Sequence, residues 1–177
     1  MEKDNFDSAS YHDEFMEDLE KLIDRSDDVF IEHHKREKNN VFPIWVIVEV
    51  MSFGTLSKLF KNMLPSDRTA LSKEYVGFSR VYVENWLQCC SYCRNIAAHG
   101  GRFYNRQLPA NPVRLSKKEK GISNVKPFAY LTAIYKLLPN LKYKEEMKKE
   151  LSQLFVSYPF VKKYLYGFPE EWEKFLP

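Results

Sequence analysis

The side chains best suited to chemistry in this 177-residue chain lie between positions 94 and 106. This stretch holds three arginines, two asparagines and one histidine. Arginine binds phosphate through a rigid fork of donors, and histidine can gain or lose a proton near neutral pH. Together these groups supply what cleavage of an RNA phosphodiester requires. The pattern therefore indicates a phosphate-directed site that needs neither a metal nor a cofactor.

Helix geometry restricts where these side chains can lie relative to one another. Asn95 and His99 are four residues apart and share a helix face, whereas Arg94 and His99 are about 140° apart on a regular helix. His99 must therefore lie at or just past the helix end if it is to converge with Arg94. Gly100 and Gly101 predict that end, because glycine tolerates the left-handed C-cap conformation. The structural alternative is an ion pair for Arg94 and an interaction of His99 with the helix dipole.

The elements that position these residues are predicted to be helices, because apolar residues recur at helical spacing almost throughout. We expect one long helix over residues 11–36, a helix over 44–51, and a break at 52–55 before the pattern resumes to 63. A short helix follows Pro65 with Ser66 as its N-cap. A long helix capped by Ser79 runs to His99, and two more cover residues 127–138 and 142–156.

The predicted helix over 44–51 is apolar on nearly every side, so we expect it to be buried. Glu49 is the exception, and a buried carboxylate is costly unless it is paired or hydrogen-bonded. One interpretation is a structural ion pair or a capping role. The other is that Glu49 holds Arg94 or Arg102 in place.

A basic loop is predicted over residues 100–124, after the motif-bearing helix. It holds six cations and few acids: Arg102, Arg106, Arg114, Lys117, Lys118 and Lys120. Such a loop is either a solvated surface or a track for a phosphate backbone. The aromatic residues of the tail are expected to pack back onto the bundle, with stacking on RNA bases as the alternative: Phe160, Tyr164, Phe168 and Trp172.

Length and composition predict one globular domain over residues 1–177. The chain is 44% hydrophobic and 15% aromatic, which suffices for a core and excludes a disordered chain. The net charge of +3 is too small to argue nucleic-acid binding by itself. No apolar run can span a bilayer and the first residues are acidic and polar, so we expect a cytoplasmic protein without membrane contact. Cys89, Cys90 and Cys93 share one helical pattern and are interpreted as core thiols.

Several blocks of the sequence resemble one bacterial family. The motif Arg94-Asn-x-x-Ala-His99-x-x-Arg102-aromatic-aromatic-Asn105-Arg106 is similar to the signature of the Abi-like (abortive infection, AbiD/AbiF-type) family, within the HEPN superfamily. Residues 43–57 resemble its P-x-W-x-x-x-E-x-x-S-F-G-x-x-S block, which includes Glu49. Trp86 and Tyr92 also fit, as does the closing G-F-P-x-x-W at residues 167–172. The resemblance covers roughly residues 10–172.

The sequence departs from the family pattern at two places. Gly100 stands where family members often carry a second histidine, and Phe103-Tyr104 replaces a leucine–tryptophan pair. The change at Gly100 puts a role for paired histidines in doubt, whereas the second change keeps two aromatic side chains for packing. We also expect that this chain lacks an N-terminal helical region of longer family members.

The resemblance implies an all-α, HEPN-like helical bundle and a metal-independent endoribonuclease that acts in phage defence. In that mechanism His99 is the general base or acid, Arg94 binds the scissile phosphate, and Asn95 orients His99 or the phosphate. Arg102, Asn105 and Arg106 hold RNA or brace the motif. HEPN domains pair so that two motifs face each other, which implies a homodimer with a composite site. The implied partners are RNA and an antitoxin or a phage trigger.

Two other functions fit the same residues. HEPN-like bundles also serve as non-catalytic RNA-binding or protein-interaction modules, and Gly100 favours this alternative. A third interpretation is a protein-interaction partner that neutralises a toxin, which predicts no RNA binding.

Overall fold

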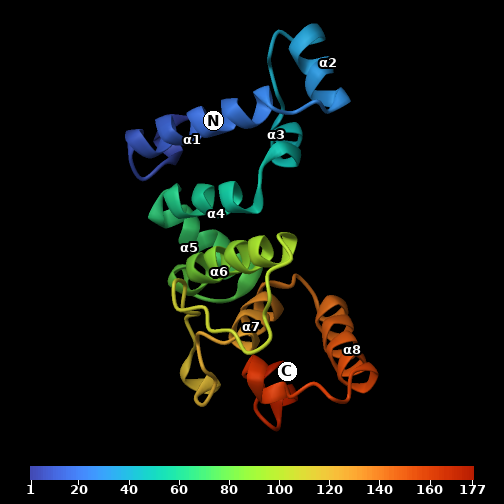
Figure 1. The fold of residues 1–177 in the computed structure, drawn as a ribbon. Coiled ribbons are helices and arrows are strands. Elements are labelled where there is room, and N and C mark those ends of the chain that lie inside the picture. The colour runs from blue at the N-terminus through green and yellow to red at the C-terminus, as the bar shows by residue number, and fades with distance from the viewer. The chain divides into compact units, whose positions relative to one another are not determined.

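The computed structural model describes all residues 1–177 and is all-helical, as predicted, with eight α-helices and no strand (Figure 1). The chain forms two compact units, residues 1–68 and 69–177, which are described separately. No helix combines the length and the apolar character needed to cross a membrane. The expectation of a single domain stays a prediction.

The first unit is built on the apolar face of its longest helix, α1. Its elements are η1 (Lys3–Asn5), α1 (Ala9–Asp24), α2 (Val29–Glu37), α3 (Ile44–Val50), α4 (Phe53–Asn62) and most of α5 (Pro65–Leu71). Phe15 and Leu19, four residues apart on α1, are buried against Ile47 and Met51. These contacts join α1 to α3 and give the unit a small core of its own.

The expected single helix over residues 11–36 is wrong, because the chain leaves the helical conformation between Asp24 and Val29. The Ser26 hydroxyl donates to the Asp28 carboxylate at 2.6 Å and accepts from the Asp28 backbone N–H at 3.3 Å. Short polar side chains that bond the local backbone compete with helix in this way. The apolar spacing continues across the break because α1 and α2 each keep a buried face.

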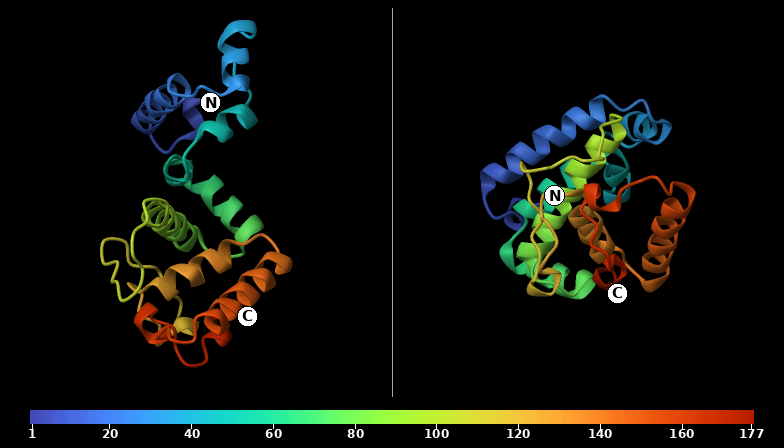
Figure 2. Two further views of the ribbon diagram at one scale, coloured as in Figure 1. Left: turned by 45° about the vertical axis from the view of Figure 1, so that its right-hand side comes forward. Right: turned by 60° about the horizontal axis from the view of Figure 1, so that its bottom comes forward.

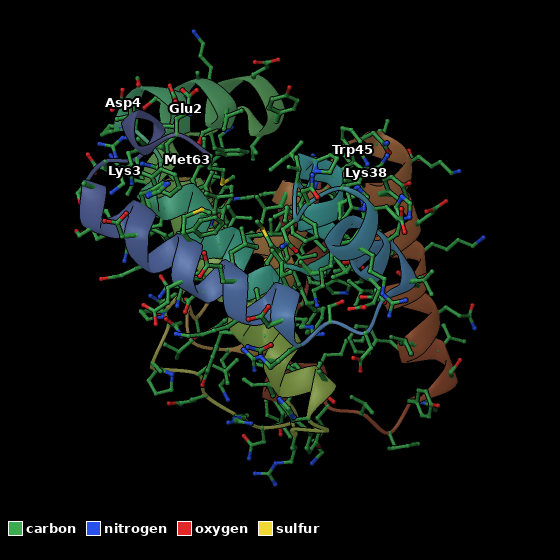
Figure 3. All side chains as sticks on the ribbon, turned by 90° about the horizontal axis from the view of Figure 1, so that it is seen from above. Glu2, Lys3, Asp4, Lys38, Trp45 and Met63 are labelled. Atoms are coloured by element: carbon green, nitrogen blue, oxygen red, sulfur yellow. The ribbon has the colours of Figure 1, made fainter.

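The helix α3 is only half buried, which corrects the expectation of burial on all sides. Val46 and Ile47 are buried, whereas Ile44 and Val48 are exposed and Trp45, labelled in Figure 3, is 70% exposed. Glu49 is also exposed, and it forms no hydrogen bond or ion pair. The carboxylate therefore carries no burial cost within the first unit.

The turns that flank α4 follow local capping rules. Ser52 caps this helix, since its hydroxyl accepts from the Thr55 N–H at 3.0 Å. After α4, Met63 pairs with Phe6 in an isolated bridge, which brings it beside the N-terminal turn (Figure 3). The expected cap at Ser66 is wrong: α5 begins at Pro65, which suits a first helical position because it has no N–H to leave unpaired.

The second unit surrounds the nearly fully buried helix α7. Its elements are η2 (Ser72–Val76), α6 (Arg80–Ala98), η3 (Lys117–Glu119), α7 (Pro127–Leu137), α8 (Leu141–Ser157), η4 (Lys163–Tyr166) and η5 (Trp172–Phe175). Figures 1 and 2 show α7 between α6 and the C-terminal segment. Phe128 of α7 packs with Phe168 and Trp172, and all three are buried with Trp86 of α6. The predicted helices over 127–138 and 142–156 are confirmed to within a residue or so.

Only two of the four aromatic side chains of the tail pack into the core as predicted. Phe168 and Trp172 are buried in the core, but Phe160 and Tyr164 are 78% and 64% exposed. Phe160 lies in the turn between α8 and η4, and Tyr164 lies within η4 with its side chain directed away from the core. The prediction of core thiols is confirmed for Cys89 and Cys90, which are buried and unbridged, whereas Cys93 is half-buried against the core. Burial raises the pKa of the Cys89 and Cys90 thiols to about 12.

The predicted loop over residues 100–124 contains a short helical turn, η3, which the sequence prediction missed. Ser116 and Glu119 form a capping box around it: the Ser116 hydroxyl accepts from the turn and Glu119 accepts from the Ser116 N–H at 2.6 Å. The spacing Ser-x-x-Glu is the signal that predicts such a turn. Glu119 also forms an ion pair with Lys136 of α7, and the two side chains are only 7% and 10% exposed.

The buried ion pair of Glu119 and Lys136 yields a stability prediction. Glu119→Gln is expected to lower the free energy of unfolding by about 3 kcal/mol at neutral pH, because it leaves the Lys136 ammonium buried without a carboxylate. Burial by itself raises the pKa of Glu119, but hydrogen bonds from Lys136 and Ser116 outweigh it and hold the pKa below its ordinary value of 4.5. Urea unfolding of both proteins measures the difference.

The same ion pair fixes the pH dependence of that difference. A depressed pKa means that Glu119 stabilises the fold above its ordinary pKa and loses this contribution as the pH falls through its folded pKa. The gap between the wild type and Glu119→Gln should therefore stay constant from neutral pH down to the ordinary carboxyl pKa of 4.5 and shrink as the pH falls below it. Glu146→Gln, at an exposed pair 3.9 Å from Lys142, is the control and should change little. An equal gap at every pH would contradict the role of the Glu119 carboxylate.

Candidate functional site

The candidate site is built on the C-terminal end of α6, which terminates as the glycine pair predicts. His99 is the C-cap residue, and Gly100 follows with φ +65° in the left-handed region. The Gly100 N–H donates to the Ala97 carbonyl at 3.0 Å and the Gly101 N–H to the Ile96 carbonyl at 2.7 Å. This pair of bonds is the Schellman motif, which satisfies the last helical carbonyls. His99 thus sits where the chain turns out of the helix.

Gly101 is required for a different reason from Gly100. A Cβ atom at Gly101 would lie 2.6 Å from Ile96 Cγ2 and 2.8 Å from the Ile96 carbonyl oxygen. The chain therefore passes so close to the last turn of α6 that only glycine fits. This close return sets the direction in which the following arginines leave the helix.

Arg94, Asn95 and His99 are all exposed at this end of α6. The Arg94 Nη1 atom donates to the Asn95 Oδ1 atom at 3.2 Å. Asn95 therefore contacts Arg94, whereas the sequence prediction had it orient His99 or the phosphate. The His99 ring forms no hydrogen bond within the protein, so both nitrogens are open to a ligand.

The residues after the glycine pair fall into two roles. The Arg106 Nη1 atom donates back to the Arg102 carbonyl at 3.4 Å, and Asn105 adopts a left-handed conformation with φ +52°. Arg106 is half-buried, whereas Arg102 and Asn105 are exposed. Arg106 thus braces the turn, and Arg102 points its guanidinium to solvent.

The two aromatic residues of this turn are packed, as the sequence predicted. Phe103 lies against the core of the second unit, and Tyr104 contacts Tyr166 edge-on at 5.4 Å between ring centroids. Their packing fixes the turn that carries Arg102 and Arg106. Glu49 belongs to the first unit and Arg94 and Arg102 to the second, so a contact between them stays a prediction.

The basic loop is anchored by three side chains that the sequence analysis missed. The Asn85 carboxamide of α6 accepts from the Arg114 N–H at 2.6 Å, and the Trp86 Nε1 donates to the Arg114 carbonyl at 2.9 Å. The Tyr130 hydroxyl of α7 donates to the Leu108 carbonyl at 3.0 Å. The signal that could have found Trp86 and Tyr130 is the polar tip of a buried aromatic side chain, which needs a partner.

The cations of this region share a lack of acidic partners. None of the following seven forms an ion pair: Arg94, Arg102, Arg106, Arg114, Lys117, Lys118 and Lys120. Their charge is therefore available to an anion, and all except Arg106 are exposed. An accessible imidazole and unpaired guanidinium groups at one end of a helix can transfer protons and stabilise charge on phosphate oxygens.

Comparison with known proteins finds one family. The model of the family described as Abi-like protein matches residues 1–105. This range holds the block at 43–57 and the motif from Arg94 to Asn105, whereas Arg106 and the block at 167–172 lie outside it. No curated protein and no solved structure matches the chain.

Substitutions of Gly100 and Gly101 at the end of α6 are predicted to lower the free energy of unfolding for different reasons. Gly100→Ala is expected to lower the free energy of unfolding by about 1–2 kcal/mol, because alanine is strained at positive φ. Gly100→Asn should cost less, because asparagine tolerates this conformation. Gly101→Ala should cost about 1–3 kcal/mol through overlap with Ile96, whatever its φ. Urea unfolding measures all three, and a harmless Gly101→Ala would contradict the close approach.

Proposed function

The chain belongs to the Abi-like protein family, and from this premise we propose that it is a metal-independent endoribonuclease of the HEPN type. Membership of this family supports a function related to abortive infection. The observation that carries the proposal is the exposed end of α6, where the His99 ring has no internal partner and Arg94 has no acid. The finer proposal of RNA cleavage rests on these side chains and on the motif to which they belong.

The proposed reaction uses the RNA's own 2′-hydroxyl. His99 removes its proton as a general base, or donates a proton to the leaving 5′ oxygen as a general acid. The 2′ oxygen attacks the phosphorus, the bond to the 5′ oxygen breaks, and the products carry a 2′,3′-cyclic phosphate and a 5′-hydroxyl. Arg94 stabilises the charge that develops on the phosphate. Asn95 positions the Arg94 guanidinium through the 3.2 Å hydrogen bond.

A homodimer with a composite site is part of the proposal. One histidine cannot readily act as both acid and base in a single step, and each chain offers only His99 at this site. A second copy supplies the second imidazole and the second arginine. The exposure of this end of α6 in the single chain supports such pairing.

The unpaired cations give the proposed path for RNA. Arg102 and the exposed cations of the basic loop bind phosphates on either side of the cut, and Arg106 braces their support. Such contacts are independent of base sequence and weaken as salt rises. In phage defence the enzyme cleaves host or phage RNA in the cytoplasm once an antitoxin is released or a phage trigger is sensed.

The second candidate function is a non-catalytic RNA-binding or protein-interaction module. Gly100 favours it, because family members often carry a second histidine at that position. On this alternative the same cations bind RNA but His99 is dispensable. Cleavage and binding must therefore be measured side by side.

Cleavage of labelled single-stranded RNA in EDTA tests the first proposal. The wild type is expected to cut and leave 2′,3′-cyclic phosphate ends. His99→Ala should reduce the rate by about 10²–10⁴-fold, because it removes one positioned acid–base group. The mass of the active species, measured by light scattering, should be that of two chains.

His33→Ala, at an exposed histidine of α2, is the matched control and should cut like the wild type. Equal cleavage by the wild type and His99→Ala would refute the role of His99. RNA binding without cleavage by the wild type would support the second candidate. If the wild type neither binds nor cuts RNA, the result supports the toxin-neutralising interpretation.

Growth of cells that express the protein tests the toxin-like role. Wild-type expression is expected to slow growth, and Arg94→Ala should restore it, because the scissile phosphate loses its charge partner. Arg36→Ala, at an exposed arginine of α2, serves as the control and should slow growth as the wild type does. Equal growth of cells with the wild type and Arg94→Ala would count against the nuclease.

A further inference from the structure

A pocket rich in charge lies away from His99 and shares Lys118 with the basic loop, and we call it the lysine pocket. It has a volume of about 390 Å³ and lies wholly within the second unit. Its walls come from Phe78 just before α6, from η3, from the end of α7, from the start of α8 and from the C-terminal segment. Phe78 of this pocket lies just before Arg80, whereas His99 follows the other end of α6. The 19 residues of that helix separate the two by about 28 Å.

The lysine pocket carries an excess of positive charge. It is lined by Lys118, Lys136, Lys144 and Lys174 but by a single acidic side chain, Glu119. Glu119 is already paired with Lys136, and Lys174 is 2.7 Å from Glu171. Lys118 and Lys144 have no carboxylate partner. The pocket therefore favours an anion with more than one negative charge, and lysine binds phosphate as a compact point charge.

The cations are held in place by the aromatic walls. The Lys136 ammonium lies 5.4 Å from the centroid of the Phe78 ring and 5.0 Å from that of Trp86. The Lys144 ammonium lies 5.4 Å from the centroid of the Tyr135 ring. Lys144 is half-buried and lines the pocket.

The aromatic walls also suit a planar group on the ligand. Phe78 packs edge-on against Trp86 with ring centroids 4.9 Å apart, and Phe175 packs edge-on against Phe128 at 6.4 Å. Both rings are thereby fixed while they still line the pocket. Nucleobases stack on such side chains because every base has a π face.

We propose that the lysine pocket binds a nucleoside phosphate. The phosphate contacts Lys118, Lys144 and Lys174, and the base packs against Phe78 and Phe175. The volume lies within the range of about 300–1,000 Å³ that is common for small-ligand sites. The ligand is either a free nucleotide or the phosphorylated end of an RNA strand, since both present the same chemistry.

Calorimetric titration of the full chain tests the proposal, with AMP, adenosine and inorganic phosphate as probes. AMP is expected to bind more tightly than adenosine or inorganic phosphate. Lys144→Glu should weaken AMP binding by about tenfold or more, because it replaces a charge-assisted contact with repulsion. Lys149→Glu, an exposed position of the same helix outside the pocket, should bind AMP like the wild type.

Two single-stranded RNAs, one with a 5′-phosphate and one with a 5′-hydroxyl, identify the source of the ligand. The titrations use His99→Ala, which keeps the RNA intact if the proposed cleavage holds. AMP binding that depends on Lys144 supports a free nucleotide. Tighter binding of the 5′-phosphorylated RNA than of the 5′-hydroxyl RNA, with the difference lost when Lys144→Glu is added, supports a strand end.

Three results would overturn the lysine pocket as a nucleotide site. They are the absence of binding by AMP and of any preference for the 5′-phosphorylated RNA, adenosine binding as tightly as AMP, or measurable AMP binding that is equal in the wild type and Lys144→Glu. Circular dichroism verifies that Lys144→Glu is folded. If it is not, Lys174→Ala replaces it, with the same expected loss of AMP affinity and the same contradicting result.

Discussion

The packing of α6 against α7 is the constraint on which the second unit depends. It buries Trp86 and Tyr130, whose polar tips must find partners once they are removed from water. The carbonyls of the basic loop supply them, at Arg114 and Leu108. One buried interface therefore forms the core and also ties the cationic loop to the helix that ends at His99.

The two ends of α6 are specialised in different ways. At the C-terminal end, Arg94 in the helix and His99 at its C-cap are exposed, and the Schellman motif turns the chain out of the helix. At the N-terminal end, Phe78 and the ion pair of Glu119 and Lys136 form the walls of the lysine pocket. The same ion pair fixes η3 on α7, so it positions both the basic loop and the pocket. A change at Glu119 therefore affects the stability of the fold, the position of the basic loop and the walls of the lysine pocket.

The small net charge of the chain conceals an uneven distribution of paired and unpaired charges. Acidic side chains pair with cations along the outer helices, as for Lys21 with Glu17 in α1. The cations of the basic loop are left without such partners. An accessible phosphate-binding surface can thus exist in a chain whose net charge is only +3.

The sequence by itself determined the features that depend on neighbouring residues. Helical spacing gave the all-α class, and Gly100 with Gly101 gave the end of α6, because left-handed backbone and close approach are local demands. Ser116 and Glu119 carried an equally local signal, which the prediction did not use. Residues 26–28 interrupt the first predicted helix by bonds between adjacent side chains and backbone, which apolar spacing does not register.

Only the tertiary structure decided which apolar and polar groups are covered. An apolar pattern states that a side chain can be buried but not whether a partner element reaches it. Trp45, Phe160 and Tyr164 are therefore exposed in spite of their type, while Phe168 and Trp172 meet α7. Likewise, spacing placed Arg94, Asn95 and His99 on one helix end, but their contacts depend on rotamers. The structure alone joined Asn95 to Arg94 and gathered the lysines of the pocket from four separate segments.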